Sequence, residues 1–135
     1  MKYIATKNPH SNKWFPRSIS SGKIVSTDRL MIEIAKASTV SPADVAGVLR
    51  ALADAMTDHL CDGDKVQLDN IGTFYLMAEA RGNGVATEEE VSPIQINRVN
   101  VRFAPQKTHI GGGMGKIPTL ANGKITWERS GGKSS

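Results

Sequence analysis

The sequence lacks the features that stabilise small secreted domains or anchor a chain in a membrane. It has one cysteine, Cys61, which excludes an intramolecular disulfide and favours a reducing cytoplasm. Residues 1–7 lack the apolar run of a signal peptide, and no stretch approaches the roughly 20 apolar residues of a membrane-spanning helix. We therefore expect a soluble, cytoplasmic protein with no membrane partner.

The sequence also lacks a recognisable catalytic constellation. His10, His59 and His109 are far apart and have no cysteine or carboxylate partners at metal-ligand spacing. Cys61 has no evident base beside it, and the glycines of residues 111–116 lack the Gly-Lys-Ser/Thr ending and following helix of a phosphate-binding loop. These absences predict a protein that is not an enzyme, with no metal, cofactor or small-molecule substrate.

Large side chains are scarce, since aromatic residues make up 5% of the 135 residues. The hydrophobic content of 39% suffices for a core, but a short chain with few large side chains buries limited apolar area. Association of two copies is therefore expected.

Charge is unevenly distributed along the chain, whose net charge is +4. Residues 1–27 carry five bases and no acid, and residues 91–135 carry seven bases and one acid. Residues 28–90 between them are acidic. Basic ends suit an anionic partner, because phosphate contacts gain affinity from counterion release, although basic tails can also serve only solubility.

The pattern of residues predicts strands first and then two helices. Residues 3–6 and 14–19 flank a cluster of turn formers at 8–12, which indicates a strand pair with Pro16 at an edge. A helix is expected from Ser26 or Thr27 onward. A second begins after Ser41 and ends at Gly63. Its apolar stripe, at i, i+3, i+4 and i+7 spacing, includes Val45, Leu49, Leu52 and Met56.

Alternating strands follow the helices. Residues 65–69 and 73–77 flank a tight turn and predict a hairpin, residues 81–90 predict an exposed loop, and residues 94–96 and 99–103 alternate again. Helices followed by segregated strands indicate an α+β fold. We expect three parts, namely an N-terminal extension (1–25), a central domain (26–110) and a glycine-rich flexible tail (111–135), in which only residues 124–128 could form a strand.

Two segments resemble the HU/integration-host-factor family of bacterial histone-like DNA-binding proteins. Residues 63–74 resemble that family's passage from the second helix through the first hairpin, with Asn70 and Ile71 in place of its Gly and Phe. Residues 101–107 resemble its V-x-F-x-P-x-K segment. The resemblance covers residues 26–107. The added ends resemble a divergent branch in which the HU domain is fused to a glycine-rich motif.

This resemblance implies an intertwined homodimer whose β-arms reach into the minor groove of duplex DNA in the nucleoid. In one copy, the apolar stripe of the second helix together with Phe74 and Phe103 is too large for a single short helix to cover. A partner copy is therefore expected to cover it. The expected dimer core is Val45, Leu49, Leu52, Met56, Phe74 and Phe103. The expected DNA contacts are Arg81, Asn83, Arg98, Arg102 and Lys107, of which Lys107 matches the family's phosphate-contacting lysine and alternation puts Arg98 and Arg102 on one face.

The arm departs from the family pattern. The family's tip carries a proline that wedges between base pairs, whereas residues 81–87 contain none. Met77 and Glu79 stand where arginines are usual, and three acids follow at residues 88–90. We therefore expect a reduced, largely non-specific mode of backbone binding. The alternative is an HU-like dimeric protein-interaction or assembly module with weak or no DNA binding, in which Arg98 and Arg102 only solvate an exposed face.

The N-terminal aromatic residues have two interpretations. Tyr3, Trp14 and Phe15 lie among four bases, and aromatics interleaved with bases can stack on nucleobases. Alternatively, they dock the extension onto the domain through hydrophobic contacts.

Overall fold

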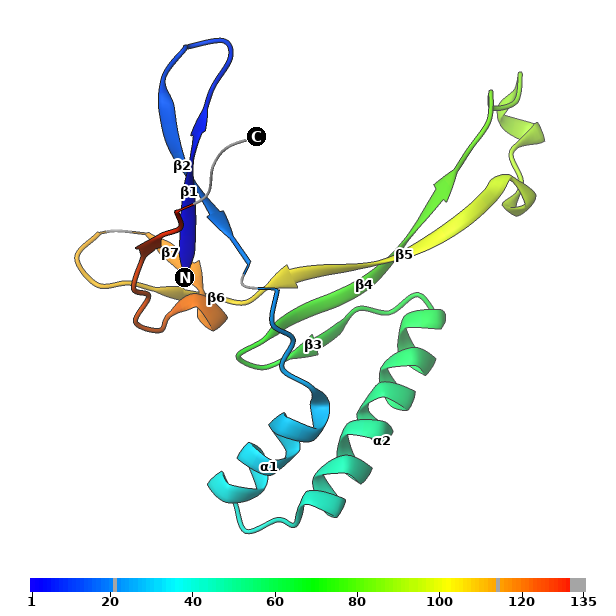
Figure 1. The fold of residues 1–135 in the computed structure, drawn as a ribbon. Coiled ribbons are helices and arrows are strands. Elements are labelled where there is room, and N and C mark those ends of the chain that lie inside the picture. The colour runs from blue at the N-terminus through cyan, green and yellow to red at the C-terminus, as the bar shows by residue number, and fades with distance from the viewer. Residues whose placement is uncertain (21, 114, 132–135) are drawn as a thin grey trace. The chain divides into compact units, whose positions relative to one another are not determined.

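The computed structural model describes residues 1–20, 22–113 and 115–131, and its fold is α+β (Figure 1). The chain forms two compact units. The first comprises Met1–Pro42 and Gly123–Ser135, and the second is Ala43–Asn122. Elements from both ends of the sequence therefore belong to the same unit.

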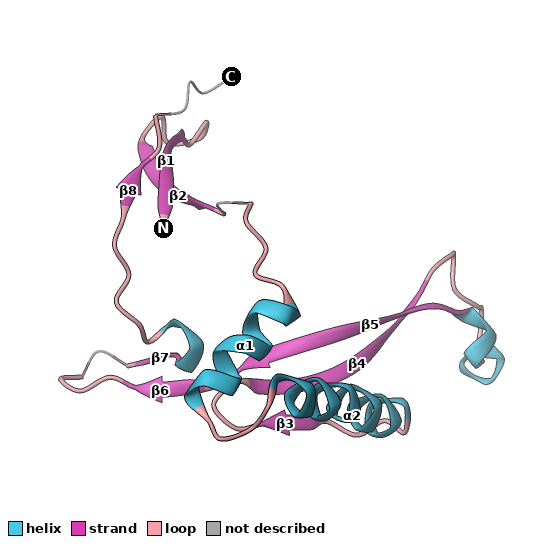
Figure 2. Ribbon diagram, turned by 60° about the horizontal axis from the view of Figure 1, so that its bottom comes forward, coloured by secondary structure: helices cyan, strands magenta, loops and turns pink. Residues whose placement is uncertain are grey.

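The first unit contains a three-stranded sheet of order β2-β1-β8 (Figure 2). β1 (Lys2–Lys7) and β2 (Trp14–Ile19) form the predicted antiparallel pair, and Pro16 lies on the edge strand, as expected. The side chain of Asn8 accepts hydrogen bonds from the backbone N–H groups of the two residues at 10 and 11, which closes the turn between the strands. β8 (Glu128–Arg129) runs parallel to β1.

The helix of the first unit begins where the sequence predicts. α1 (Thr27–Ala37) has Ser26 as its N-cap, and the Ser26 hydroxyl accepts a hydrogen bond from the backbone N–H of Arg29. Asp28 in the first turn is favoured by the helix dipole. None of the apolar residues of α1 is buried.

Apart from its first residue, the long helix α2 (Pro42–Cys61) belongs to the second unit. Gly63, which has a φ of 94°, stops the helix just beyond its last residue, and the N–H groups of Gly63 and Asp64 donate to the carbonyls of Leu60 and His59. This is the Schellman pattern, in which a left-handed glycine satisfies the last carbonyls of a helix. The predicted C-terminal stop is therefore confirmed.

The main sheet of the second unit has the order β3-β4-β5, and all its pairs are antiparallel. β3 (Val66–Leu68) turns through Asn70, whose φ is 66°, into β4 (Gly72–Ala80), and β5 (Ile96–Pro105) returns along β4. A Cβ on Gly72 would lie 2.4 Å from the carbonyl oxygen of Ala104 and 2.6 Å from the Phe103 ring. Only glycine fits this close approach of strand to strand.

A second hairpin overlaps the segment expected to be a flexible tail. β6 (Lys107–His109) pairs with β7 (Lys116–Pro118), and a 3₁₀ turn follows at Thr119–Ala121. The expectation that only residues 124–128 of the tail could form a strand was wrong, because glycine-rich surroundings obscure strands as short as β7. The hairpin also spans the expected boundary at residue 110. The division of the chain into three functional parts stays a prediction.

Candidate nucleic-acid interface

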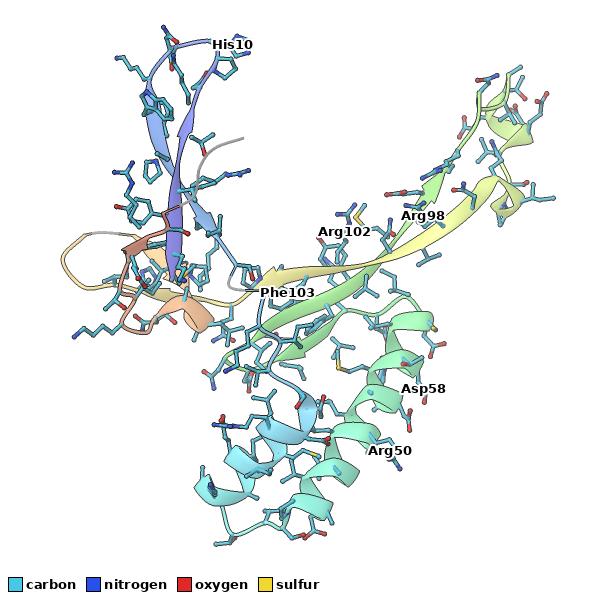
Figure 3. All side chains as sticks on the ribbon, in the orientation of Figure 1. His10, Arg50, Asp58, Arg98, Arg102 and Phe103 are labelled. Carbon is cyan, nitrogen blue, oxygen red and sulfur yellow. The ribbon has the colours of Figure 1, made fainter. Side chains whose placement is uncertain are left out.

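The β4–β5 ribbon separates its side chains into a polar and an apolar face. Strand register pairs Tyr75 with Arg102 and Glu79 with Arg98. Because side chains alternate along a strand, these four residues share one face with Asn100. The prediction that Arg98 and Arg102 share a face is therefore confirmed. Figure 3 shows both arginines on the side of the ribbon turned away from α2.

The charge of this polar face is mixed. A carboxylate oxygen of Glu79 lies 3.9 Å from a guanidinium nitrogen of Arg102, and both side chains are substantially exposed. Glu79 also stands directly opposite Arg98. An exposed ion pair of this length contributes little stability, so both guanidinium groups remain accessible to an incoming anion. Glu79 nevertheless lowers the positive potential that the two arginines create.

Lys65 extends the polar face at the sheet edge opposite β5, because it immediately precedes β3. Its Nζ lies 5.2 Å from the centroid of the Tyr75 ring, which is within the range of a cation–π contact. Sequence reasoning did not single out Lys65 as a binding residue. The sequence did contain a signal for Lys65, because Lys65 occupies a polar position in the alternating pattern that leads into β3.

The tip of the ribbon carries the other two predicted arm residues. Arg81 follows the last residue of β4, and Asn83 lies between Gly82 and Gly84, both of which have positive φ. All of these side chains are exposed, as is the 3₁₀ turn Glu88–Glu90 on the return path. The tip therefore combines one arginine with three carboxylates, and its net charge is negative.

Lys107 lies on the β6–β7 hairpin, apart from the ribbon strands. Register pairs Lys107 with Pro118 and His109 with Lys116, so Lys107, His109 and Lys116 share one face of the hairpin. Sequence reasoning missed Lys116, which only the pairing of β6 with β7 brings to this face. The five predicted contacts thus fall in three places, on the ribbon face, at its tip and on this hairpin.

Gln106 ties the β6–β7 hairpin to the ribbon. Its backbone N–H donates to the carbonyl of Ile71 at 3.0 Å, and its side-chain oxygen accepts from the N–H of Asn70 at 2.8 Å. Its carbonyl accepts from the N–H of Thr119 at 2.7 Å. Three hydrogen bonds to both flanking segments fix the direction in which the chain leaves β5 and so the place of Lys107.

The apolar face of the ribbon is incompletely covered. Phe74 and Phe103 stand opposite each other with ring centroids 4.8 Å apart, but Phe103 is 43% exposed and Val101 is 64% exposed. Of the hydrophobic residues that the structure describes, only Val45 and Leu60, both on α2, are buried. Leu49, Leu52, Met56 and Phe74, which complete the expected dimer core, are half-buried. A soluble chain rarely leaves such a face open to water.

The described residues offer neither a metal site nor a membrane-spanning helix. No group of three or more His, Cys, Asp or Glu residues in residues 1–20, 22–113 and 115–131 could hold a metal ion. Across the same described ranges, neither helix is both long and apolar enough to cross a membrane.

Comparison with known proteins identifies a family and a similarity to solved structures. The family described as "HU domain fused to wHTH, Ig, or Glycine-rich motif" matches residues 2–112. Among solved structures, the chain is similar to a "Putative bacterial DNA binding protein" from Bacteroides vulgatus ATCC 8482, at 12% identity and a TM-score of 0.49. The similarity covers 76% of this chain but only 41% of that protein. No curated protein matches.

Proposed function

This chain belongs to the HU domain family whose members are fused to wHTH, Ig or glycine-rich motifs, and from this premise we propose that it binds duplex DNA as a homodimer. The proposed role is architectural and non-enzymatic, in the nucleoid of a bacterial cytoplasm, with little sequence preference. Its ligand is the phosphate backbone rather than base edges, because contacts to phosphates carry no direct sequence information.

The observation that carries this proposal is the contrast between the two faces of the β4–β5 ribbon. One face presents Arg98 and Arg102 to solvent, and the opposite face leaves Val101 and Phe103 exposed. Burying the apolar face against a second copy removes it from water, and leaves the arginine face of each copy outward. The same association therefore stabilises the fold and displays cations on both copies.

The proposed dimer core consists of the stripe on α2 and the two phenylalanines of the ribbon. Its residues are Val45, Leu49, Leu52, Met56, Phe74 and Phe103. Burial of apolar side chains contributes roughly 25 cal/mol for each Å² removed from water, so the half-exposed members gain most from a partner.

The proposed DNA contacts combine the ribbon face with its tip and the following hairpin. Arg98, Arg102 and Lys107 contact phosphates, and Arg81 and Asn83 contact the backbone from the tip. Without a proline at the tip, the ribbon has no wedge of the kind that separates base pairs, which suits backbone binding without deep intercalation.

A second candidate function is supported by the acids of the ribbon. Glu79 neutralises part of the arginine face, and Glu88–Glu90 put three carboxylates beside the tip. Carboxylates repel phosphates, so these residues favour an HU-like dimer that binds other proteins and binds DNA weakly or not at all.

The salt dependence of duplex binding tests the proposal. The affinity of the intact protein for a random-sequence duplex is measured at several salt concentrations, for wild type, Arg102→Ala and Lys107→Ala. Each lost phosphate contact reduces the slope of log affinity against log salt by about one unit.

The matched control is Arg50→Ala, which removes an arginine from α2, on the outer side of that helix (Figure 3). Its slope should equal that of wild type. Unchanged slopes for both Arg102→Ala and Lys107→Ala would refute binding by the ribbon face and by the β6–β7 hairpin, and would leave the assembly module as the function.

A further inference from the structure

The sheet of the first unit carries a groove with aromatic walls. Its cavity volume is about 710 Å³, within the roughly 300–1,000 Å³ of typical ligand pockets. The residues that line it include Tyr3, Trp14, Phe15, Pro16, Trp127 and Arg129. They come from both ends of the sequence, because β8 lies beside β1.

Strand register places most of these side chains on one face of the sheet. Tyr3 pairs with Arg129, Ala5 pairs with Pro16, and Lys7 pairs with Trp14. These pairs are two positions apart along β1, so their side chains lie on the same face of the sheet. Trp14 is 60% exposed and Trp127 is 54% exposed. Two indole rings that open to solvent in one groove offer flat apolar surfaces on which another planar group can stack.

The charge around the groove is positive. The Nζ of Lys7 lies 6.0 Å from the centroid of the Trp14 ring, and Arg129 lines the groove. Glu128, the acid of this sheet, pairs with Lys2 and so belongs to the opposite face. Residues 1–27 contain no acid. The groove therefore offers cations beside aromatic rings, with no carboxylate on its own face of the sheet.

We propose that this groove binds single-stranded nucleic acid, with bases stacked on Trp14 and Trp127 and phosphates held by Lys7 and Arg129. Stacking on exposed aromatic rings with a basic lining is the way proteins bind single strands without reading sequence. A duplex cannot use these rings in the same way, because the faces of its bases are already stacked on one another. An apolar peptide would leave both cations without partners.

This inference is independent of duplex binding by the ribbon, because it rests on a different unit and on different residues. Either activity can fail without the other. A single chain with both would hold duplex through one unit and a single strand through the other.

Intrinsic fluorescence of the full-length chain tests the groove. The protein is titrated with an oligothymidylate of about eight nucleotides, a length within the roughly 4–16 nucleotides that single-strand binding folds cover. The variants Trp14→Phe and Trp127→Phe each leave one tryptophan. Because both rings line one groove, the emission of the remaining tryptophan should be quenched in both variants.

Affinity measurements locate the bound strand. Trp14→Ala should weaken binding of the oligonucleotide about 10-fold or more, as expected for the loss of one stacked base. Arg129→Ala should weaken it about 3-fold, whereas Arg17→Ala, which removes the same charge from the other face of the sheet, should leave it unchanged. Arg102→Ala in the ribbon should also leave it unchanged.

Three results would overturn the proposal. They are the absence of quenching in both single-tryptophan variants, equal losses for Arg17→Ala and Arg129→Ala, and equal quenching by a duplex of the same length. If Trp14→Ala fails to fold, Trp14→Phe and Arg129→Ala still test the proposal. Both should fold, because Phe keeps an aromatic ring at position 14 and Arg129 is exposed at the surface.

Discussion

The β3-β4-β5 sheet and the β2-β1-β8 sheet both carry cations, but they differ in what accompanies those cations. On the β4–β5 ribbon the arginines stand beside Glu79, and the opposite face is apolar and open. On the β2-β1-β8 sheet the cations stand beside exposed tryptophans. The comparison teaches that charge alone does not identify a nucleic-acid partner. The neighbouring groups decide whether a surface suits a backbone or unstacked bases.

The largest expected effect concerns the open apolar face of the ribbon. Val101→Asp should convert the proposed dimer to monomer, because an unpaired charge buried in an interface costs about 3–5 kcal/mol. Light scattering across a range of protein concentrations measures the change. Asn100→Asp adds the same charge to the neighbouring residue, which points to the polar face, and should leave the mass unchanged. Equal masses for the two variants would contradict a dimer formed through the apolar face.

The next largest effect concerns the close contact between β4 and β5 at Gly72. Gly72→Ala should lower the free energy of unfolding by roughly 3 kcal/mol, since its Cβ would overlap the Ala104 carbonyl and the Phe103 ring. Gly84→Ala, at a tip position with a φ of 70° and open space around it, should cost only about 1 kcal/mol. Denaturant melts compare the two variants. Equal losses would contradict the close approach of β4 and β5.

The smallest expected effect concerns Glu79, the acid that distinguishes the arginine face of the ribbon from the cations of the β2-β1-β8 sheet. Glu79→Gln removes the carboxylate beside Arg98 and Arg102 while keeping the size of the side chain, so duplex affinity at low salt should rise about 2- to 5-fold. Fluorescence anisotropy with a labelled duplex measures this change, and the gain should shrink as salt is added. An affinity that does not change would mean that duplex does not approach this face, as the assembly function requires.

Local sequence signals were sufficient for most elements of the fold. Ser26 marked the start of α1, and Gly63 marked the end of α2, because caps are determined by a few neighbouring residues. The two-residue period of β5 put Arg98 and Arg102 on one face. These predictions needed no knowledge of distant contacts.

The contacts that sequence reasoning missed are non-local or very short. β8 pairs with β1 across more than 120 residues, and nothing in residues 124–128 identifies that partner. β7 has three residues beside several glycines. The ion pair of Glu79 with Arg102 depends on the register of β4 and β5, which shifts between Glu79 and Ala80 and is not fixed by alternation alone. Trp127 joins the aromatic groove for the same non-local reason.

The central claim is that one face of the ribbon joins two copies while the other binds duplex, and the mass of the complex tests it most directly. Light scattering of the protein bound to a short duplex should give two chains of 14.5 kDa for each DNA molecule, at protein concentrations that saturate binding. A complex that holds a single chain at undiminished affinity would contradict the account.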